Sequence, residues 1–434
     1  MMYIDNILFA IILVAGIGFF AKNVKKLKRN INLGHDINRK DNPSARWKNM
    51  AMIALGQSKM VKRPVAGFLH IIVYAGFIII NIEVLEIIID GLFGTHRIFS
   101  FLGGFYGFLI SSFEVLAILV LVAVIIFWIR RNIIRLKRFA SSDLKGAPKK
   151  DADIILYFEM VLMSLFLIMN ATDLHFQAMN SGNLISQYIN PWFLSLDLVQ
   201  VEIIEKVAWW LHITGILIFL NYLYYSKHLH ILLAFPNTYF ADLNPKGKFD
   251  NLESVTKEVK LMMDPNVDPF AAQPLNENAV PSKFGVSDVQ DLNWVQLLNA
   301  YTCTECGRCT SSCPANQTGK KLSPRKIMMD TRDRMEEVGR NIDANKGVFV
   351  PDNKSLLNDY ITAEELWACT SCNACVEECP VNISPLSIIM DMRRYLVMEQ
   401  SAAPQSLNAM MTNIENNGAP WQYNQQDRLN WKNE

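Results

Sequence analysis

The sequence predicts an all-α protein in which a five-helix transmembrane bundle precedes a cytosolic α-helical domain with two cysteine-rich loops. Three observations predict this class. Long apolar runs are confined to the first 235 of the 434 residues, all seven histidines lie at or before residue 230, and all eight cysteines lie after residue 300. This separation indicates two kinds of cofactor in two parts of the chain. The net charge of +1 gives no reason to expect nucleic-acid binding.

The cysteine-rich loops are two copies of the spacing C-x₂-C-x₂-C-x₃-C-P. Three thiolates of such a loop can bind one iron–sulfur cluster, while the fourth cysteine, before proline, ligates the other cluster in proteins with two clusters. Structural zinc usually takes two C-x₂-C pairs, and disulfides at these short spacings would be strained, so both alternatives suit the pattern poorly. We therefore predict two [4Fe–4S] clusters, one bound by Cys303, Cys306, Cys309 and Cys379 and the other by Cys369, Cys372, Cys375 and Cys313.

Five apolar runs are long enough to cross about 30 Å of hydrocarbon. They are residues 4–20, 65–90, 101–129, 153–170 and 207–234. Positive charges follow the first run instead of preceding it, which favours a retained helix over a cleaved signal peptide. The segments 21–63 and 130–150 carry twelve and eight Lys/Arg, whereas 91–100 and 171–206 carry one each. The positive-inside rule therefore predicts that the N-terminus is outside and that the cysteine-rich domain is in the cytoplasm.

Composition divides the chain into four predicted parts. Residues 1–235 form the transmembrane domain, and residues 236–287 form a proline-rich cytosolic connector. Residues 288–400 form the two-cluster domain, in which the helix expected after each cysteine loop begins with Ser-Pro, at Ser323 and Ser384. Residues 401–434 are rich in Asn and Gln and are predicted to be an arm or a partner contact.

Three histidines of the apolar part are candidate haem ligands. His212 and His230 are 18 residues apart, so on one continuous helix they would face the same way, about 27 Å apart. His70, at the cytoplasmic depth of a neighbouring helix, could oppose His230 and complete an inner site. His228 is expected to be interfacial. These histidines could instead be polar groups at helix ends, but ionisable residues within a membrane are costly and usually functional, which favours haem.

The apolar part resembles the cytochrome b (gamma) subunit of respiratory nitrate reductases. Phe-Leu-His70-Ile-Ile resembles the ligand motif of that family's second helix, and Leu211-His212 with Ser-Lys-His-Leu-His230-Ile resembles the pair on its fifth helix. The cysteine-rich domain resembles the two-cluster subunit of heterodisulfide reductases. The fused arrangement is similar to electron-transfer-flavoprotein:menaquinone oxidoreductase systems. The resemblance covers about residues 70–235 and 290–400, and it implies a cytochrome b bundle followed by a dicluster ferredoxin domain in a bacterial or archaeal cytoplasmic membrane.

The chain departs from the nitrate reductase pattern at one ligand. The family has a second histidine ten residues after the first, where this chain has Ile80. His175 or His96, both on outer segments, could replace the missing ligand of an outer haem. Otherwise His212 could bind quinone, or the outer site could be empty.

The sequence also predicts a quinone reaction. Glu83 and Glu86, in the outer half of the second apolar run, are candidates for proton exchange with quinone, although each could simply pair within the bundle. No nucleotide-binding glycine motif is present, and the predicted clusters use every cysteine. We therefore expect a membrane subunit that passes electrons between a cytosolic partner and menaquinone or another quinone through two [4Fe–4S] clusters and haem b.

Partners and alternatives follow from the same pattern. The resemblance implies a soluble redox subunit with cysteine-rich (CCG) domains, with electron-transfer flavoprotein as a further candidate. One alternative is a haem-free membrane anchor that carries a dicluster ferredoxin relay. A redox sensor is a third hypothesis, but it would need an output domain that the sequence does not display.

Overall fold

The computed structural model describes residues 2–266 and 283–433, and within these residues it is helical and contains no β-strand. Five helices among the described residues are long and apolar enough to cross a membrane. They are α1 (Met2–Ile31), α3 (Pro64–Phe93), α4 (Gly104–Asn132), α5 (Ala147–Thr172) and α8 (Leu198–Tyr222). The predicted all-α class, with five apolar helices ahead of a helical domain, is thereby confirmed.

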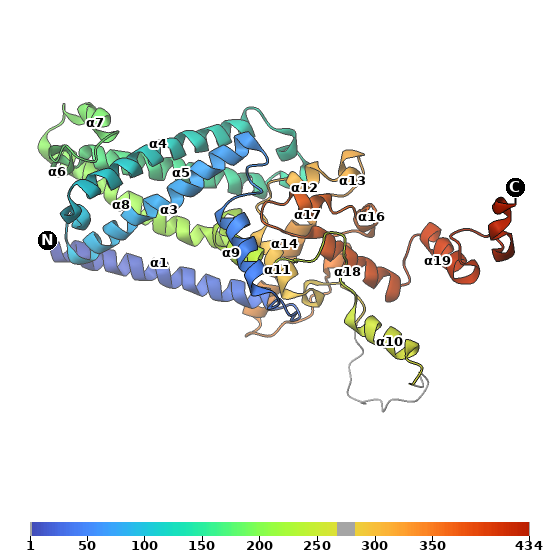
Figure 1. Cartoon of the computed structure of the whole chain (residues 1–434). Helices are drawn as coiled ribbons and strands as arrows, with labels where there is room; N and C mark the ends of the chain where they lie inside the picture. The colour runs from blue at the N-terminus through green and yellow to red at the C-terminus, as the bar shows by residue number, and fades with distance from the viewer. Residues whose placement is uncertain (1, 267–282, 434) are drawn as a thin grey trace.

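The five long helices lie side by side in one bundle (Figure 1). Helix α8 packs against α5, α5 against α4 and α4 against α3, while α1 packs against both α3 and α8. The bundle core contains Phe9, Phe113 and Phe166, all of which are almost fully buried. Outward-facing side chains such as Phe68 and Val122 are apolar and exposed. Helices that are apolar on every side suit a lipid environment, as in a multi-pass membrane protein.

The end of the bundle that holds the N-terminus is covered by α6 (Leu174–Ala178) and α7 (Ser186–Ile189), and we call it the capped end (Figure 1). Glu114 of α4 is fully buried there. Its carboxylate accepts hydrogen bonds from the backbone N–H of Ile185 at 2.7 Å and Ser186 at 3.0 Å, and from Asn170 Nδ2 at 3.0 Å. These hydrogen bonds hold the cap on the helices.

The predicted fifth helix, residues 207–234, is wrong in its extent and its continuity. Helix α8 begins nine residues earlier, at Leu198, and continues into the 3₁₀ segment Leu223–Tyr225. Ser226 then adopts an extended backbone, with φ −118° and ψ 156°, and the chain restarts as Lys227–Leu229 and α9 (His230–Tyr239). Asp151 anchors this break, because it accepts hydrogen bonds from Tyr222 Oη at 2.7 Å and from Lys227 N at 3.1 Å. His212 and His230 therefore do not share one helix.

The cysteine-rich domain lies at the other end of the bundle, which we call the domain end (Figure 1). Its two longest helices, α14 (Pro324–Ala344) and α18 (Pro385–Met398), begin as predicted: Ser323 and Ser384 cap them by accepting backbone N–H hydrogen bonds, and proline follows each. The shorter helices of this domain are α11 (Trp294–Thr302), α12 (Arg308–Ser311), α13 (Pro314–Gln317), α15 (Leu356–Asp359), α16 (Ala363–Trp367) and α17 (Ala374–Glu378).

The two parts of the chain share a core. Leu27 of α1, Leu229 directly before α9, and Ala234 of α9 belong to the same buried apolar cluster as the cysteine-rich domain. Helix α14 packs closely on α1, because a Cβ at Gly339 would lie 2.6 Å from Asn30 Oδ1. The link between α1 and α3 contains α2 (Pro43–Met50) and the π-helical turn Ala51–Leu55.

The remaining segments surround these two parts. Helix α10 (Glu253–Met263) and the C-terminal α19 (Gln405–Asn417) project away from the body (Figure 1). Residues 267–282 of the predicted connector lie outside the described residues. Short 3₁₀ turns complete the chain at Ile98–Leu102, Lys137–Phe139, Ser142–Leu144, Asn190–Phe193, Val289–Asp291 and Gln425–Lys432.

Candidate functional site

Five cysteines line one small cavity at the domain end, and four of them are Cys303, Cys306, Cys309 and Cys379. Cys303 and Cys306 lie between α11 and α12, Cys309 lies in α12, and Cys379 directly follows α17. Met328 and Ile383 add apolar walls, and Cys375 of the second motif also reaches the cavity. These four are the cysteines that the sequence assigns to one cluster, and we call them the first cysteine group.

The other four cysteines form a second group. Burial raises the pKa of the Cys375 thiol to about 12, and the neighbouring thiols of Cys369, Cys313 and Cys372 oppose its ionisation further. Cys372 is exposed, so this second cysteine group reaches the protein surface. The assignment of the eight cysteines to two clusters stays a prediction, because Cys375 lines the cavity together with the first group.

Both groups have the donor chemistry that iron–sulfur clusters need. Burial raises the pKa of Cys303 to about 12 and that of Cys379 to about 11. Buried thiolates at these positions need compensating positive charge, which a bound metal provides. Backbone N–H groups point at the sulfurs, from Ile383 to Cys379 Sγ at 3.2 Å and from Ser371 to Cys369 Sγ at 3.4 Å. Such hydrogen bonds to sulfur tune cluster potentials.

The first cysteine group lies against the bundle. Arg308 is 3% exposed and donates hydrogen bonds to the backbone oxygens of Lys59 at 3.0 Å and Met60 at 3.2 Å, just before α3. In return, Lys59 Nζ donates to the backbone oxygen of Cys379 at 3.3 Å. Gly307 has a φ of +73°, and a Cβ there would lie 3.0 Å from the backbone oxygen of Arg138. The cysteine loop therefore approaches the bundle more closely than any larger residue would allow.

His70 and His230 lie near each other at the domain end, with their ring centroids 6.4 Å apart and their ring planes tilted by 40°. His70 comes from α3, and His230 is the first residue of α9. His230 Nδ1 lies 3.0 Å from the backbone oxygen of Lys227, an arrangement in which Nδ1 donates and Nε2 keeps its lone pair. His70 Nδ1 is buried and has no hydrogen-bond partner within the described part of the chain.

His228 belongs to the same histidine group. Its ring centroid lies 5.5 Å from that of His230, and its Nε2 lies 3.7 Å from Glu159 Oε1. Its side chain is only 13% exposed, so it is mostly buried within the protein, and its expected position at the membrane interface stays a prediction. The break at Ser226 turns this residue inward, and burial lowers its pKa to about 3, which keeps the ring neutral.

The structure does not bring the remaining predicted histidines together. His212 is buried on α8, with Nδ1 3.0 Å from the backbone oxygen of Leu162 and its ring beside Phe166. His175 lies instead beside His96, with ring centroids 5.4 Å apart, at the capped end. His96 in turn contacts Asp173, with 3.2 Å between His96 Nε2 and Asp173 Oδ2.

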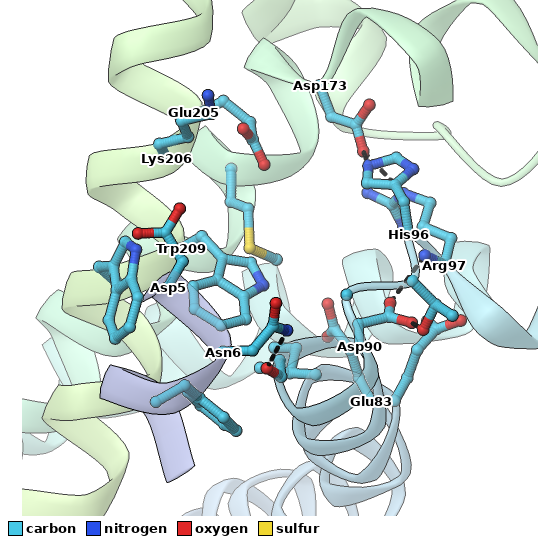
Figure 2. A pocket seen from close by; sticks show the side chains of 18 residues that line it. Asp5, Asn6, Glu83, Asp90, His96, Arg97, Asp173, Glu205, Lys206 and Trp209 are labelled. Atoms are coloured by element: carbon cyan, nitrogen blue, oxygen red, sulfur yellow. Dashed lines mark hydrogen bonds and ion pairs between the residues drawn. The ribbon is translucent and has the colours of Figure 1, made fainter. Parts of the chain in front are cut away.

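A cavity of about 260 Å³ opens at the capped end, between α1, α3, α5 and α8 (Figure 2). Glu83 lines it and is 3% exposed, and its Oε2 has no hydrogen-bond partner among residues 2–266 and 283–433. Glu86 also lines it, but its two oxygens accept hydrogen bonds from Phe99 N at 2.9 Å and Tyr106 Oη at 3.0 Å. The two predicted acids therefore differ: Glu83 has a free oxygen, whereas Glu86 is fully engaged.

Sequence reasoning missed the ion pair on the wall of this cavity. Arg97 is 6% exposed, and its Nε donates to Asp173 Oδ2 at 2.7 Å. Figure 2 shows Asp173 facing both His96 and Arg97. Burial opposes ionisation of Asp173, but the hydrogen bond from His96 and the charge of Arg97 hold its pKa below the usual range. The available signal was Arg97 and Asp173, each close to the end of an apolar run on the same side.

Comparison with known proteins supports the cysteine assignment at the level of the domain. A family described as "4Fe-4S dicluster domain" matches residues 299–383. The chain is 30% identical to a probable iron-sulfur-binding oxidoreductase, FadF, of Bacillus subtilis, over 99% of this chain and 61% of the relative. It is 25% identical to the EtfAB:quinone oxidoreductase of Syntrophomonas wolfei, over 94% of this chain and 57% of the relative.

A third relative matches over a shorter stretch. A probable membrane-anchored ferredoxin of Chromohalobacter salexigens is 35% identical over 34% of this chain and 24% of the relative. The chain thus spans less than two thirds of the length of all three relatives. No solved structure matches it. Residues 299–383 are therefore a 4Fe–4S dicluster domain, and the chain is related to iron–sulfur oxidoreductases.

Proposed function

We propose that this chain passes electrons between a cytosolic partner and menaquinone or another quinone in the membrane, through two [4Fe–4S] clusters and haem b. The two cysteine groups would hold the clusters, His70 and His230 the haem, and the cavity beside Glu83 the quinone. Clusters and haem supply one-electron exchange, whereas quinone takes up two electrons and two protons.

The observation that carries the proposal is the His70–His230 pair next to the first cysteine group. Two imidazoles that share one metal, with bonds of about 2 Å, have ring centres about 6 Å apart, and the two rings are 6.4 Å apart. The hydrogen bond between His230 Nδ1 and a backbone oxygen is typical of metal-binding histidine. His212 makes the same kind of contact. His212 therefore makes the contact of a candidate ligand for a second haem, but its expected partners, His175 and His96, pair with each other at the capped end instead.

Glu83 is the residue best suited to proton exchange with quinone. A buried carboxyl with a free oxygen can accept or donate a proton at the cavity, and Trp209 and Phe9 supply aromatic walls there. Lys/Arg-rich segments at the domain end support an orientation with the capped end and the N-terminus outside and the dicluster domain in the cytoplasm. Protons would then exchange on the outer side.

The partner would meet the second cysteine group. The exposure of Cys372 supports this group as the one that exchanges electrons with a soluble protein. The relative named EtfAB:quinone oxidoreductase supports electron-transfer flavoprotein as that protein. A soluble subunit with cysteine-rich (CCG) domains is the other candidate.

A second function has its own support. The relative named as a membrane-anchored ferredoxin favours a haem-free anchor that carries a dicluster relay. In that case His70, His228 and His230 would be polar groups that pack at the end of the bundle.

One spectrum separates the two functions. The purified full chain is measured by dithionite-reduced minus air-oxidised absorbance, with haem and non-haem iron quantified per chain. We expect eight irons, as two cubanes require, and at least one b-type haem that is lost in His70→Ala and His230→Ala. His35→Ala, at an exposed histidine outside the bundle, is the matched control. Full iron content without haem would overturn the haem assignment and leave the anchor.

A further inference from the structure

A buried ion cluster joins the first cysteine loop to the segment that carries His230. Glu305, between Cys303 and Cys306, is 4% exposed and has a φ of +53°, which is uncommon for a residue other than glycine. Its carboxylate accepts hydrogen bonds from Lys227 Nζ and from Arg332 Nη1, the latter at 2.9 Å. Two cations thus hold a glutamate within a cysteine loop.

Lys227 contacts residues of both proposed redox sites, the first cysteine loop and the histidine pair. Its side chain reaches Glu305 and also donates to the backbone oxygen of Pro148 at 2.7 Å. Its backbone oxygen lies 3.0 Å from His230 Nδ1. One residue therefore links the cysteine loop, through its ammonium group, to the candidate haem ligand, through its carbonyl group.

We propose that the Lys227–Glu305 pair sets the midpoint potential of the cluster bound by the first cysteine group, and that this cluster is the one next to the bundle. The second group would hold the distal cluster, which faces the partner. The inference rests on the proposed function only in its use of haem, because the cluster potential can be measured whether or not haem is present.

The expected effects follow from charge. One-electron reduction adds one negative charge at the cysteine loop, and nearby charges act strongly where water is excluded. Loss of the Lys227 ammonium leaves Glu305 less neutralised, so reduction becomes harder and the potential falls. Loss of the Glu305 charge leaves two cations beside the loop, so reduction becomes easier and the potential rises. Arg332, which also pairs with Asp333, is present in both variants.

The test is a redox titration of the whole chain in which electron paramagnetic resonance monitors both clusters. It is carried out on Lys227→Met, Glu305→Gln and the double variant. Lys26→Met is the matched control. Lys26 also makes an ion pair between α1 and the dicluster domain, 2.6 Å from Asp343 Oδ2, but it lies on an exposed surface away from the cysteine loop. We expect one cluster potential to fall in Lys227→Met, to rise in Glu305→Gln and to return toward the wild-type value in the double variant.

The outcomes decide the inference separately from the proposed function. The second cluster and the Lys26→Met control should keep wild-type potentials. Equal shifts of both clusters, or no shift, would overturn the inference even if haem is present, whereas absence of haem affects only the proposed function. If Lys227→Met fails to load iron, Glu305→Gln decides alone: a raised potential supports the pair and an unchanged one refutes it. Lys227→Arg retains the charge and should keep the wild-type potential.

Discussion

Replacement of Glu83 by glutamine tests where quinone exchanges protons. Glu83 lines the cavity at the capped end, and its Oε2 makes no hydrogen bond within the described residues. Glutamine has nearly the same shape, so the bundle should load its cofactors normally. The amide, however, cannot carry the proton that quinone chemistry requires.

The size of the effect can be bounded. A positioned acid or base typically contributes 10²- to 10⁴-fold, so Glu83→Gln should slow quinone turnover by at least roughly 100-fold, or about 2.7 kcal/mol of barrier. Glu86→Gln is the matched comparison. Because Glu86 accepts hydrogen bonds from Phe99 N and Tyr106 Oη, its replacement should cost about 1 kcal/mol of stability and change the rate by less than about tenfold.

The assay is stopped-flow reoxidation of the dithionite-reduced protein by a menaquinone analogue, recorded from the absorbance of its redox centres. Iron and haem contents serve as controls for folding. Wild-type reoxidation in Glu83→Gln would refute the assignment. A slow Glu86→Gln beside a fast Glu83→Gln would transfer the role to Glu86.

Three further predictions test other parts of the structure. Cys313→Ser should change the electron paramagnetic resonance signal of the distal cluster only. Cys379→Ser should change the signal of the cluster next to the bundle only. The reverse result would mean that the fourth ligands of the two clusters are assigned the wrong way round. His96 should add pH-dependent stability, because its hydrogen bond to Asp173 raises its pKa above 6.5, against the effects of burial and Arg97 and with help from Glu205. The difference in thermal stability between wild type and His96→Gln should therefore be fully present below pH 6.5 and should vanish above the raised pKa. This difference should be no more than about 1 kcal/mol, because the His96 side chain is half exposed. A difference in stability that does not depend on pH would contradict the ion pair. Arg334 is fully buried and contacts Asp352 at 2.6 Å and Asp288 at 2.8 Å, so Arg334→Met should destabilise the dicluster domain by about 3–5 kcal/mol in denaturant titration, whereas Arg340→Met, at an exposed pair, should change it by less than about 1 kcal/mol.

Composition and spacing predicted much of this structure. The five apolar helices follow from hydropathy because lipid demands continuous apolar surface. The dicluster domain follows from a spacing that only a few metal centres use, whereas the division of its cysteines into two sets stays a prediction. The Ser-Pro starts of α14 and α18 were readable because capping depends on adjacent residues.

The missed features depend on contacts between segments distant in sequence. The charges at Glu202, Glu205 and Lys206 concealed the early start of α8, although Asp197 and Gln200 form a capping box that could have been recognised. The break at Ser226 carries no proline or glycine, and it is fixed by Asp151, 75 residues earlier in the chain. The burial of His228 and the role of Lys227 both follow from this break.

The short stretch from Ser226 to Ala234 also limits how this protein can be recombined. His230 of this stretch lies beside His70 of the bundle, whereas Leu229 and Ala234 belong to the apolar core of the dicluster domain. If the chain were cut after residue 235, where the composition changes, the dicluster domain would have an incomplete core. The bundle fragment would carry two exposed apolar residues. The bundle and the dicluster domain are therefore poor candidates for exchange as independent modules. A chimera would need to carry residues 226–239 together with the residues that they contact in both parts. A family that uses this arrangement should inherit the two parts as one unit.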